Sequence, residues 1–370
     1  VKWYQLASDR GDPAAQYNLA VCYYNGSGVS ENKAEAVKWY RLAAEQGDVR
    51  AQINLGWMYD MGEGVPKNEA EAVKWYQLAS DRGDPAAQYN LAVCYYNGSG
   101  IPKNEAEAAK LYRLAAEQGH ADAQFNLGVM YANGYGVTKD DPEAAKLYRL
   151  AAEQGHADAQ FNLGMMYANG YGVTKDDPEA AKLYRLAAEQ GHADAQFNLG
   201  MMYYKGEGVP KHDAQAVKWY RLAAEQGHAD AQFSIGWAYE FAHGVTRNKK
   251  IALSWYKKAA VNGHFRARTL LGDAYHLGDG VKKNIVTAIQ WYRMAANDSK
   301  ENKRAAYGKL AQLLSEGEGS HIDLVEAWAC WNIAAALGSD AAIVHRLELQ
   351  IKLTPQQIRK AQDRSLELMS

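Results

Sequence analysis

The stretch ADAQFNLGMMYANGYGVTKDDPEAAKLYRLAAEQGH, residues 157–192, decides the fold because it holds one complete structural repeat. Apolar side chains recur three to four residues apart over residues 157–169 and again over 178–190, which predicts two amphipathic helices. A glycine-containing loop separates them, and Asp177 followed by Pro178 is typical of an N-cap and a first helical residue. The chain has no alternating strand pattern, so the predicted fold is all-α.

The same unit recurs along the chain with a period of 36 residues. Its most constant block, Ala-Gln-aromatic-Asn-Leu, starts at Ala15, Ala51, Ala87, Ala123, Ala159 and Ala195, with variants at Ala231 and Ala267. Residues 1–28 and 73–100 match at every position. A period of this length predicts a solenoid of stacked helix–turn–helix repeats, in which each repeat buries its apolar face against its neighbours.

Three segments are predicted from the regularity of the pattern. Residues 1–296 form an array of about eight 36-residue units, of which the first is truncated, and residues 297–338 form a degenerate ninth repeat. Residues 339–370 form C-terminal capping helices, and Thr354 to Gln357 is a capping-box start to the last of them. We expect these helices to close the exposed apolar end of the array.

Charge and cysteine content argue against several classes of protein. With 41 basic and 43 acidic residues the net charge is −2, and no basic stripe suggests a nucleic-acid partner. No segment is apolar over the 18 or so residues of a spanning helix, so membrane insertion is not expected. Cys22 and Cys94 lie two repeats apart, too far for a disulfide, which leaves the compartment open. The opening string VKWY recurs inside a predicted helix at residues 73–76, so we expect the natural N-terminus and any targeting segment to be missing.

The string AEAVKWYRLAAEQG at residues 34–47 and the core residues Leu163, Gly164 and Tyr167 resemble the Sel1-like repeat family, a relative of the tetratricopeptide repeats. The resemblance covers residues 1–296 closely and the rest loosely. It implies a right-handed superhelical α/α solenoid with a concave and a convex face, and a role in assembling protein complexes. It also implies a bacterial protein, in the periplasm, the cell envelope or the cytoplasm. Some members of the family resemble immunity proteins that neutralise secreted toxins.

One side of the first helix of each repeat is the candidate binding surface, because the resemblance places it on the concave face. Stacking the repeats aligns a ladder of asparagines, namely Asn18, Asn54, Asn90, Asn126, Asn162 and Asn198. Amides both donate and accept hydrogen bonds, so such a ladder suits the backbone of an extended peptide. Beside it lie aromatic side chains, among them Phe161, Phe197 and Phe233, which supply contact area. The alternative is that the asparagines bond neighbouring repeats and the aromatics pack between helices.

We expect specificity to come from repeats whose surface residues differ from those of the other repeats, because identical repeats present identical surfaces. Ser234 and Leu270 replace the asparagine towards the C-terminal end. In the same region the standard groove residues are replaced by Trp237, Glu240, Phe241, Asp273 and His276. A second variable patch includes Trp57 and Asp60.

No catalytic or metal-binding group is predicted. The histidines that follow the helix-ending glycines, such as His156 and His192, recur once per repeat and therefore lie too far apart to share a zinc ion. Ser30 and Lys33 match the S-x-x-K motif of β-lactamases, but no Lys-Thr-Gly partner accompanies them.

The function predicted from the sequence is that of a non-enzymatic scaffold, without cofactor or metal, that binds a protein or an extended peptide. We expect a monomer unless the open N-terminal end pairs. Two alternatives stay open: an immunity protein for a cognate toxin, and a weak β-lactamase or a protein that binds or cleaves cell-wall fragments.

Overall fold

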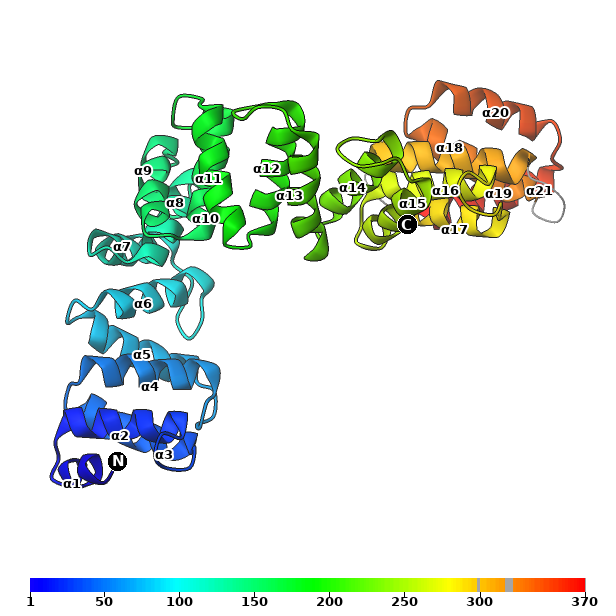
Figure 1. The fold of residues 1–370 in the computed structure, drawn as a ribbon. Coiled ribbons are helices and arrows are strands. Elements are labelled where there is room, and N and C mark those ends of the chain that lie inside the picture. Colours follow the sequence, from blue (N-terminus) through cyan, green and yellow to red (C-terminus); the bar gives the residue numbers. More distant parts are fainter. Residues whose placement is uncertain (298–299, 317–321, 370) are drawn as a thin grey trace. The chain divides into compact units, whose positions relative to one another are not determined.

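The computed structural model describes residues 1–297, 300–316 and 322–369. Residues 298–299 and 317–321, which belong to the predicted ninth repeat, lie outside the described residues. The described residues form 21 helices and no strand, and successive helix pairs pack as a solenoid, which confirms the all-α prediction (Figure 1). The chain divides into two compact units, residues 1–190 and residues 191–370.

Most helices are 12 or 13 residues long, as the sequence period requires. The first unit contains α1 (Lys2–Ser8), α2 (Pro13–Asn25), α3 (Lys33–Glu45), α4 (Val49–Met61), α5 (Glu69–Ser80), α6 (Pro85–Asn97), α7 (Glu105–Glu117), α8 (Ala121–Asn133), α9 (Asp141–Glu153), α10 (Ala157–Asn169) and α11 (Asp177–Glu189). The second contains α12 (Ala193–Lys205), α13 (Asp213–Glu225), α14 (Ala229–Phe241), α15 (Lys249–Val261), α16 (Phe265–Leu277), α17 (Ile285–Ala296), α18 (Lys300–Glu316), α19 (Leu324–Ala336), α20 (Asp340–Gln350) and α21 (Pro355–Met369). We call α2, α4 and the further even-numbered helices to α18 the first helices, and α3, α5 and the further odd-numbered helices to α19 the second helices.

The helix boundaries follow from local capping. The predicted helix at 157–169 coincides with α10, which ends at Gly170 with a φ of 74°, a left-handed conformation that glycine adopts without a steric penalty. The predicted N-cap of the next helix was wrong by one residue. Asp176, not Asp177, is the N-cap, because its side chain accepts a hydrogen bond from the backbone N–H of Glu179 at 3.0 Å.

Close packing within a repeat depends on small side chains. In the second helix α11, Ala180, Ala181, Ala187 and Ala188 are all buried, together with Tyr184. A Cβ atom on Gly164 of α10 would lie 2.9 Å from the Tyr184 ring, so glycine lets the two helices approach closely.

Within each unit, buried glutamines join successive repeats. Gln160 donates from Nε2 to the carbonyl of Ala152 at 3.1 Å, and its Oε1 accepts from Nε2 of Gln190 at 2.8 Å. Gln124 accepts in the same way from Gln154. Both amides therefore have partners on either side, which offsets the cost of removing them from water.

The recurrent histidines are helix N-caps. Nδ1 of His156 accepts from the backbone N–H of Ala159 at 3.2 Å, and its ring stacks on Phe125 with centroids 4.6 Å apart. Its Nε2 lies 3.3 Å from Oδ1 of Asp122 in the preceding repeat. His156 therefore caps its own helix and contacts the preceding repeat, and His228 does the same with Phe197 and Asp194.

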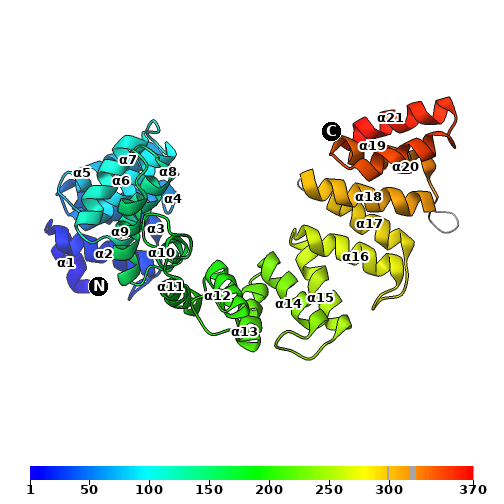
Figure 2. The same cartoon turned by 90° about the horizontal axis from the view of Figure 1, so that it is seen from above.

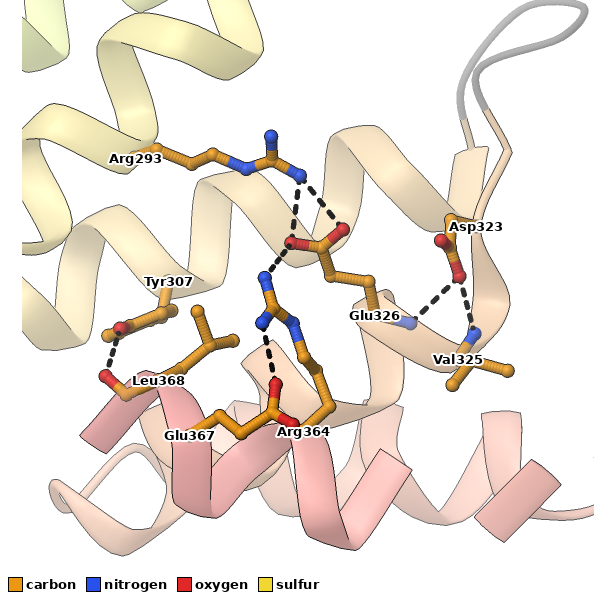
Figure 3. Close-up of polar contacts among 8 residues, drawn as sticks. All are labelled: Arg293, Tyr307, Asp323, Val325, Glu326, Arg364, Glu367 and Leu368. Carbon is orange, nitrogen blue, oxygen red and sulfur yellow. Dashed lines mark hydrogen bonds and ion pairs between the residues drawn. The ribbon is translucent and has the colours of Figure 1, made fainter. Parts of the chain in front are cut away.

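The last helix packs against α19 and covers the C-terminal end of the second unit (Figure 2). Glu326 of α19 accepts two hydrogen bonds from Arg293 at 2.8 Å and lies 3.7 Å from Arg364 of α21, while Tyr307 donates to the carbonyl of Leu368 (Figure 3). The capping box that begins α21 forms as the sequence predicts, since Gln357 and Thr354 bond each other reciprocally.

Candidate functional site

Hollows lie between successive first helices in the first unit. The first, of about 270 Å³, lies between α2 and α4 and is lined by Tyr17, Val21, Tyr24, Asn25, Tyr40, Asn54, Trp57 and Met58. The second, also of about 270 Å³, lies between α6 and α8 and is lined by Tyr89, Val93, Tyr96, Asn97, Tyr112, Asn126, Val129 and Met130. The third, of about 410 Å³, lies between α8 and α10 and includes Tyr148, Asn162, Met165 and Tyr171. Each hollow therefore combines a ladder asparagine with a tyrosine from a second helix.

The ladder asparagines of these hollows also bond inside the protein. Asn126 donates from Nδ2 to the hydroxyl of Tyr112 at 3.4 Å, and Asn54 bonds Tyr40 in the same way. Burial raises the pKa of Tyr40 to about 12, although the bond from Asn54 opposes this shift. One amide donor is thus used within the repeat array, while the side chain still lines a hollow. The remaining ladder positions Asn18, Asn90 and Asn198 are half-buried.

The aromatic positions of the ladder are half-buried between helices. Phe161 lies 5.8 Å from the Tyr184 ring, and Phe197 lies 5.8 Å from Tyr220. Phe233 stacks on His264 with centroids 4.1 Å apart. These rings pack against the second helices, and only the remaining part of each ring is open to a ligand.

The variable patch of the first unit lies on α4. Trp57 meets the ring of Tyr24 edge-on at 6.1 Å and lines the first hollow. Asp60, one turn further along, is half-buried, and burial raises the pKa of its carboxyl above the usual value. Trp57 makes this hollow different from the others of the first unit, whereas Asp60 does not line it and lies near Tyr76 and Cys94 instead.

A hollow in the second unit, of about 370 Å³, gathers the aromatic residues of α12 and α14. Trp237 lies edge-on to Tyr204 at 5.6 Å, stacks on His243 at 4.4 Å and contacts Phe241 at 5.2 Å. Phe241 itself is 55% exposed, so this cluster reaches the surface.

Two carboxylates predicted as groove residues have partners inside the protein. Glu240 accepts from the hydroxyl of Tyr256 at 2.7 Å and pairs with Lys249. Asp273 accepts from Tyr292 at 2.7 Å and pairs with Lys309 at 2.5 Å. In the regular repeats the equivalent tyrosine hydroxyl is hydrogen-bonded to an asparagine instead. His276, the remaining predicted residue of this region, is half-buried in the last turn of α16.

Sequence reasoning missed several residues of the hollow in the second unit. Asp213, Tyr220, His243 and Arg266 line it together with Trp237. His243 could have been recognised from the sequence as a departure from the repeat, since the equivalent residues of the preceding loops are Tyr171 and Glu207. Asp213 could not, because acidic residues occupy this first-turn position in other repeats as well.

No group of three or more histidine, cysteine, aspartate or glutamate side chains that could hold a metal occurs among the described residues. Lys33 of the S-x-x-K match pairs with Glu63, and this contact raises the pKa of Lys33. A lysine held as a cation is a poor general base for Ser30. In the parts of the chain that the structure describes, no helix has the length and apolar character needed to cross a membrane.

Comparison with known proteins agrees with the fold. The protective antigen of uropathogenic Escherichia coli strains, which displays an SLR fold, is 34% identical over 100% of this chain and 86% of its own, with a TM-score of 0.69. The Sel1 repeat protein of Oxalobacter formigenes is 33% identical over 66% of this chain and 96% of its own, with a TM-score of 0.58. No curated protein sequence matches the chain. The Sel1 repeat model matches residues 1–12, 13–48, 49–84, 85–120, 121–156, 157–192, 193–228, 229–264, 266–299 and 304–339. The chain therefore belongs to the Sel1 repeat family.

Proposed function

We propose that the chain is a non-enzymatic scaffold that binds an extended segment of a partner protein along the face formed by its first helices. Proteins of the Sel1 repeat family typically mediate protein–protein interaction and are generally non-enzymatic. The observation that carries the proposal is the recurrence of hollows on this face, each of 270–410 Å³ and each lined by aromatic side chains. All but the hollow of the second unit also contain a ladder asparagine.

The spacing of the hollows suits an extended chain. Packed helices are about 8–10 Å apart, and an extended polypeptide advances about 3.3–3.6 Å per residue. The hollow between α6 and α8 and the one between α8 and α10 lie one repeat apart, which corresponds to about three residues of a bound segment. Side chains three residues apart would enter successive hollows, while the asparagine amides would bond the backbone between them.

Selection from a displayed library of random 12-residue peptides, with the full chain as bait, tests this proposal. Met165→Glu places a charge in a hollow of the first unit, and Trp237→Glu does so in the second unit. Each should weaken the peptides bound in its own unit at least tenfold, because a carboxylate would be buried without a partner. Lys182→Glu and Lys218→Glu, on the exposed side of the second helices, are the matched controls.

Two results would refute the proposal. The first is a selection that yields no binding peptide. The second is a set of peptides whose affinity responds to the Lys182 and Lys218 controls but not to the hollow variants. Circular dichroism on every variant shows that a loss of binding does not come from a loss of helix.

A further inference from the structure

The hollow of the second unit contains a buried carboxylate oxygen without a hydrogen-bond donor. Oδ1 of Asp213 is buried and accepts no hydrogen bond from the described residues, whereas Oδ2 lies 3.5 Å from Nδ1 of His243. Asp213 is the first residue of α13, directly after the N-cap His212, so its backbone is fixed by the helix start. A buried acceptor without a donor costs stability, and a donor supplied by a ligand would remove that cost.

The equivalent carboxylate in the first unit does not share this property. Asp141 opens α9 as Asp213 opens α13, and it lines the third hollow of the first unit. Its Oδ1 lies 3.4 Å from Nζ of Lys139. In the second unit the residue at the position of Lys139 is Lys211, whose ammonium lies over the Tyr204 ring instead, 5.5 Å from its centroid. The two hollows thus offer a matched pair, one with an ion pair and one with an unpartnered oxygen.

A second polar group of this hollow has only a weak partner. The hydroxyl of Tyr220 donates to the thioether sulfur of Met201 at 3.1 Å. Ser234 stands at the ladder position here, and its hydroxyl donates to the carbonyl of Asp230 at 2.8 Å. A thioether is a weak acceptor, so the Tyr220 oxygen can accept from a ligand and donate to a better acceptor.

The walls of the hollow are aromatic. Trp237, Tyr204 and Phe233 line it, with Trp237 edge-on to Tyr204. Aromatic faces attract a cation through their quadrupole, and they also pack against an apolar stem. The combination of aromatic faces and an unpartnered carboxylate oxygen matches a side chain that has both a stem and a cationic head.

We propose that this hollow binds the lysine or arginine side chain of the partner segment, with its cationic head at Oδ1 of Asp213 and its stem between the aromatic walls. This inference rests on the proposed function and names the chemistry of one position of the bound segment. Arg266 also lines the hollow, but its side chain is exposed, so water screens its charge more than that of the buried Oδ1 atom. Arg266 disfavours a second basic residue next to the first, which adds selectivity.

Peptides selected by the full chain and sensitive to Trp237→Glu provide the test. They should be enriched in lysine or arginine at one position, and replacing that residue by norleucine should weaken binding about tenfold or more. Asp213→Asn should weaken the parent peptide by a similar factor and should add little to the norleucine peptide, since both changes remove the same contact. Asp141→Asn is the matched control and should leave these peptides unaffected.

Arg266→Ala gives an independent measurement at an exposed position, where folding is not at risk. It should strengthen the basic peptide severalfold and leave the norleucine peptide unchanged. Trp237-sensitive peptides without a basic residue would overturn this inference and leave the proposed function standing. Additive losses for Asp213→Asn and norleucine would also overturn it. A selection without any binding peptide would refute the proposed function and this inference together.

Discussion

Replacing Arg82 by glutamine should stabilise the pairing of α4 with α5, the two helices of the third repeat. Gln52 is buried on α4 and donates to the carbonyl of Ala44 at 3.1 Å, but its Oε1 is buried without a partner. In other repeats the residue 30 positions later is a glutamine or asparagine that donates to this oxygen, as Gln118 donates to Gln88 at 2.8 Å and Asn262 to Gln232 at 3.0 Å. At position 82 the chain has an arginine, which instead bonds the carbonyl of Gly47.

The size of the effect follows from this contact. An added neutral hydrogen bond contributes about 1 kcal/mol net, and a buried acceptor without a donor costs about 1–3 kcal/mol. The bond from Arg82 to Gly47 is lost in the variant, but it is exposed and offsets only part of the gain. We therefore expect a net local stabilisation of about 1 kcal/mol.

Hydrogen exchange is the suitable assay, because a repeat array opens locally rather than in one transition. Amides of α4 and α5 should exchange about fivefold more slowly in Arg82→Gln, which corresponds to about 1 kcal/mol. Gln118→Arg is the reverse change in a regular repeat and should accelerate exchange in α6 and α7. Unchanged exchange in Arg82→Gln, together with acceleration in Gln118→Arg, would refute the reasoning.

Three further predictions concern single groups. Ala242→Gly should slow amide exchange in α14 and α15 about fivefold, or about 1 kcal/mol, because Ala242 has a φ of 62° where other repeats have glycine; unchanged exchange would contradict the strain. Cys94 should react with iodoacetamide more slowly than Cys22, since burial raises the pKa of Cys94 to about 12 whereas Cys22 is only half-buried; equal rates, followed by mass spectrometry, would contradict it. The pKa of Tyr40 is raised from the usual 10.0 to about 12, so folding favours its neutral form, and this contribution to stability is complete below pH 10 and is lost as the pH rises towards 12. The stability of a Tyr40→Phe variant should therefore fall less than that of the parent protein between pH 10 and 12.

The helices could be predicted from the sequence because each one is set by local signals that recur. The spacing of apolar residues, the caps and the glycines locate α10 to the residue. The error at α11 arose where two aspartates, Asp176 and Asp177, are both suitable N-caps. Only the position of the backbone N–H groups decides between them, and that position is not visible in the sequence.

The candidate site was less predictable because its contacts join residues that are distant in the sequence. The ladder asparagines were identified from their period, but their bonds to tyrosines such as Tyr112 depend on how α7 packs against α8. The charged departures Glu240 and Asp273 were expected to face a partner. Each also accepts a hydrogen bond from a buried tyrosine hydroxyl and pairs with a lysine, because a hydroxyl that loses its asparagine needs another hydrogen-bond partner.

The tyrosine hydroxyls of the second helices have different hydrogen-bond partners in different repeats. Tyr148 bonds the ladder residue Asn162, and Tyr256 bonds the carboxylate of Glu240. Tyr220 has only the sulfur of Met201. The weak partner of Tyr220, the unpartnered oxygen of Asp213 and the left-handed Ala242 all fall within residues 201–244.

Each of these three features is unfavourable for folding. Other repeats have an asparagine in place of Ser234 and a glycine in place of Ala242, and in the first unit Lys139 pairs with the carboxylate equivalent to Asp213. Departures from local consistency in proteins are concentrated where binding requires them. Their coincidence with the aromatic hollow supports recognition in this repeat, because a bound cation would satisfy Asp213 and a bound donor would satisfy Tyr220. In the hollows of the first unit the equivalent groups already have partners, since Asp141 pairs with Lys139 and Tyr148 bonds Asn162. Under the proposed function these hollows supply shape and apolar contact, and the hollow around Trp237 supplies chemical selectivity.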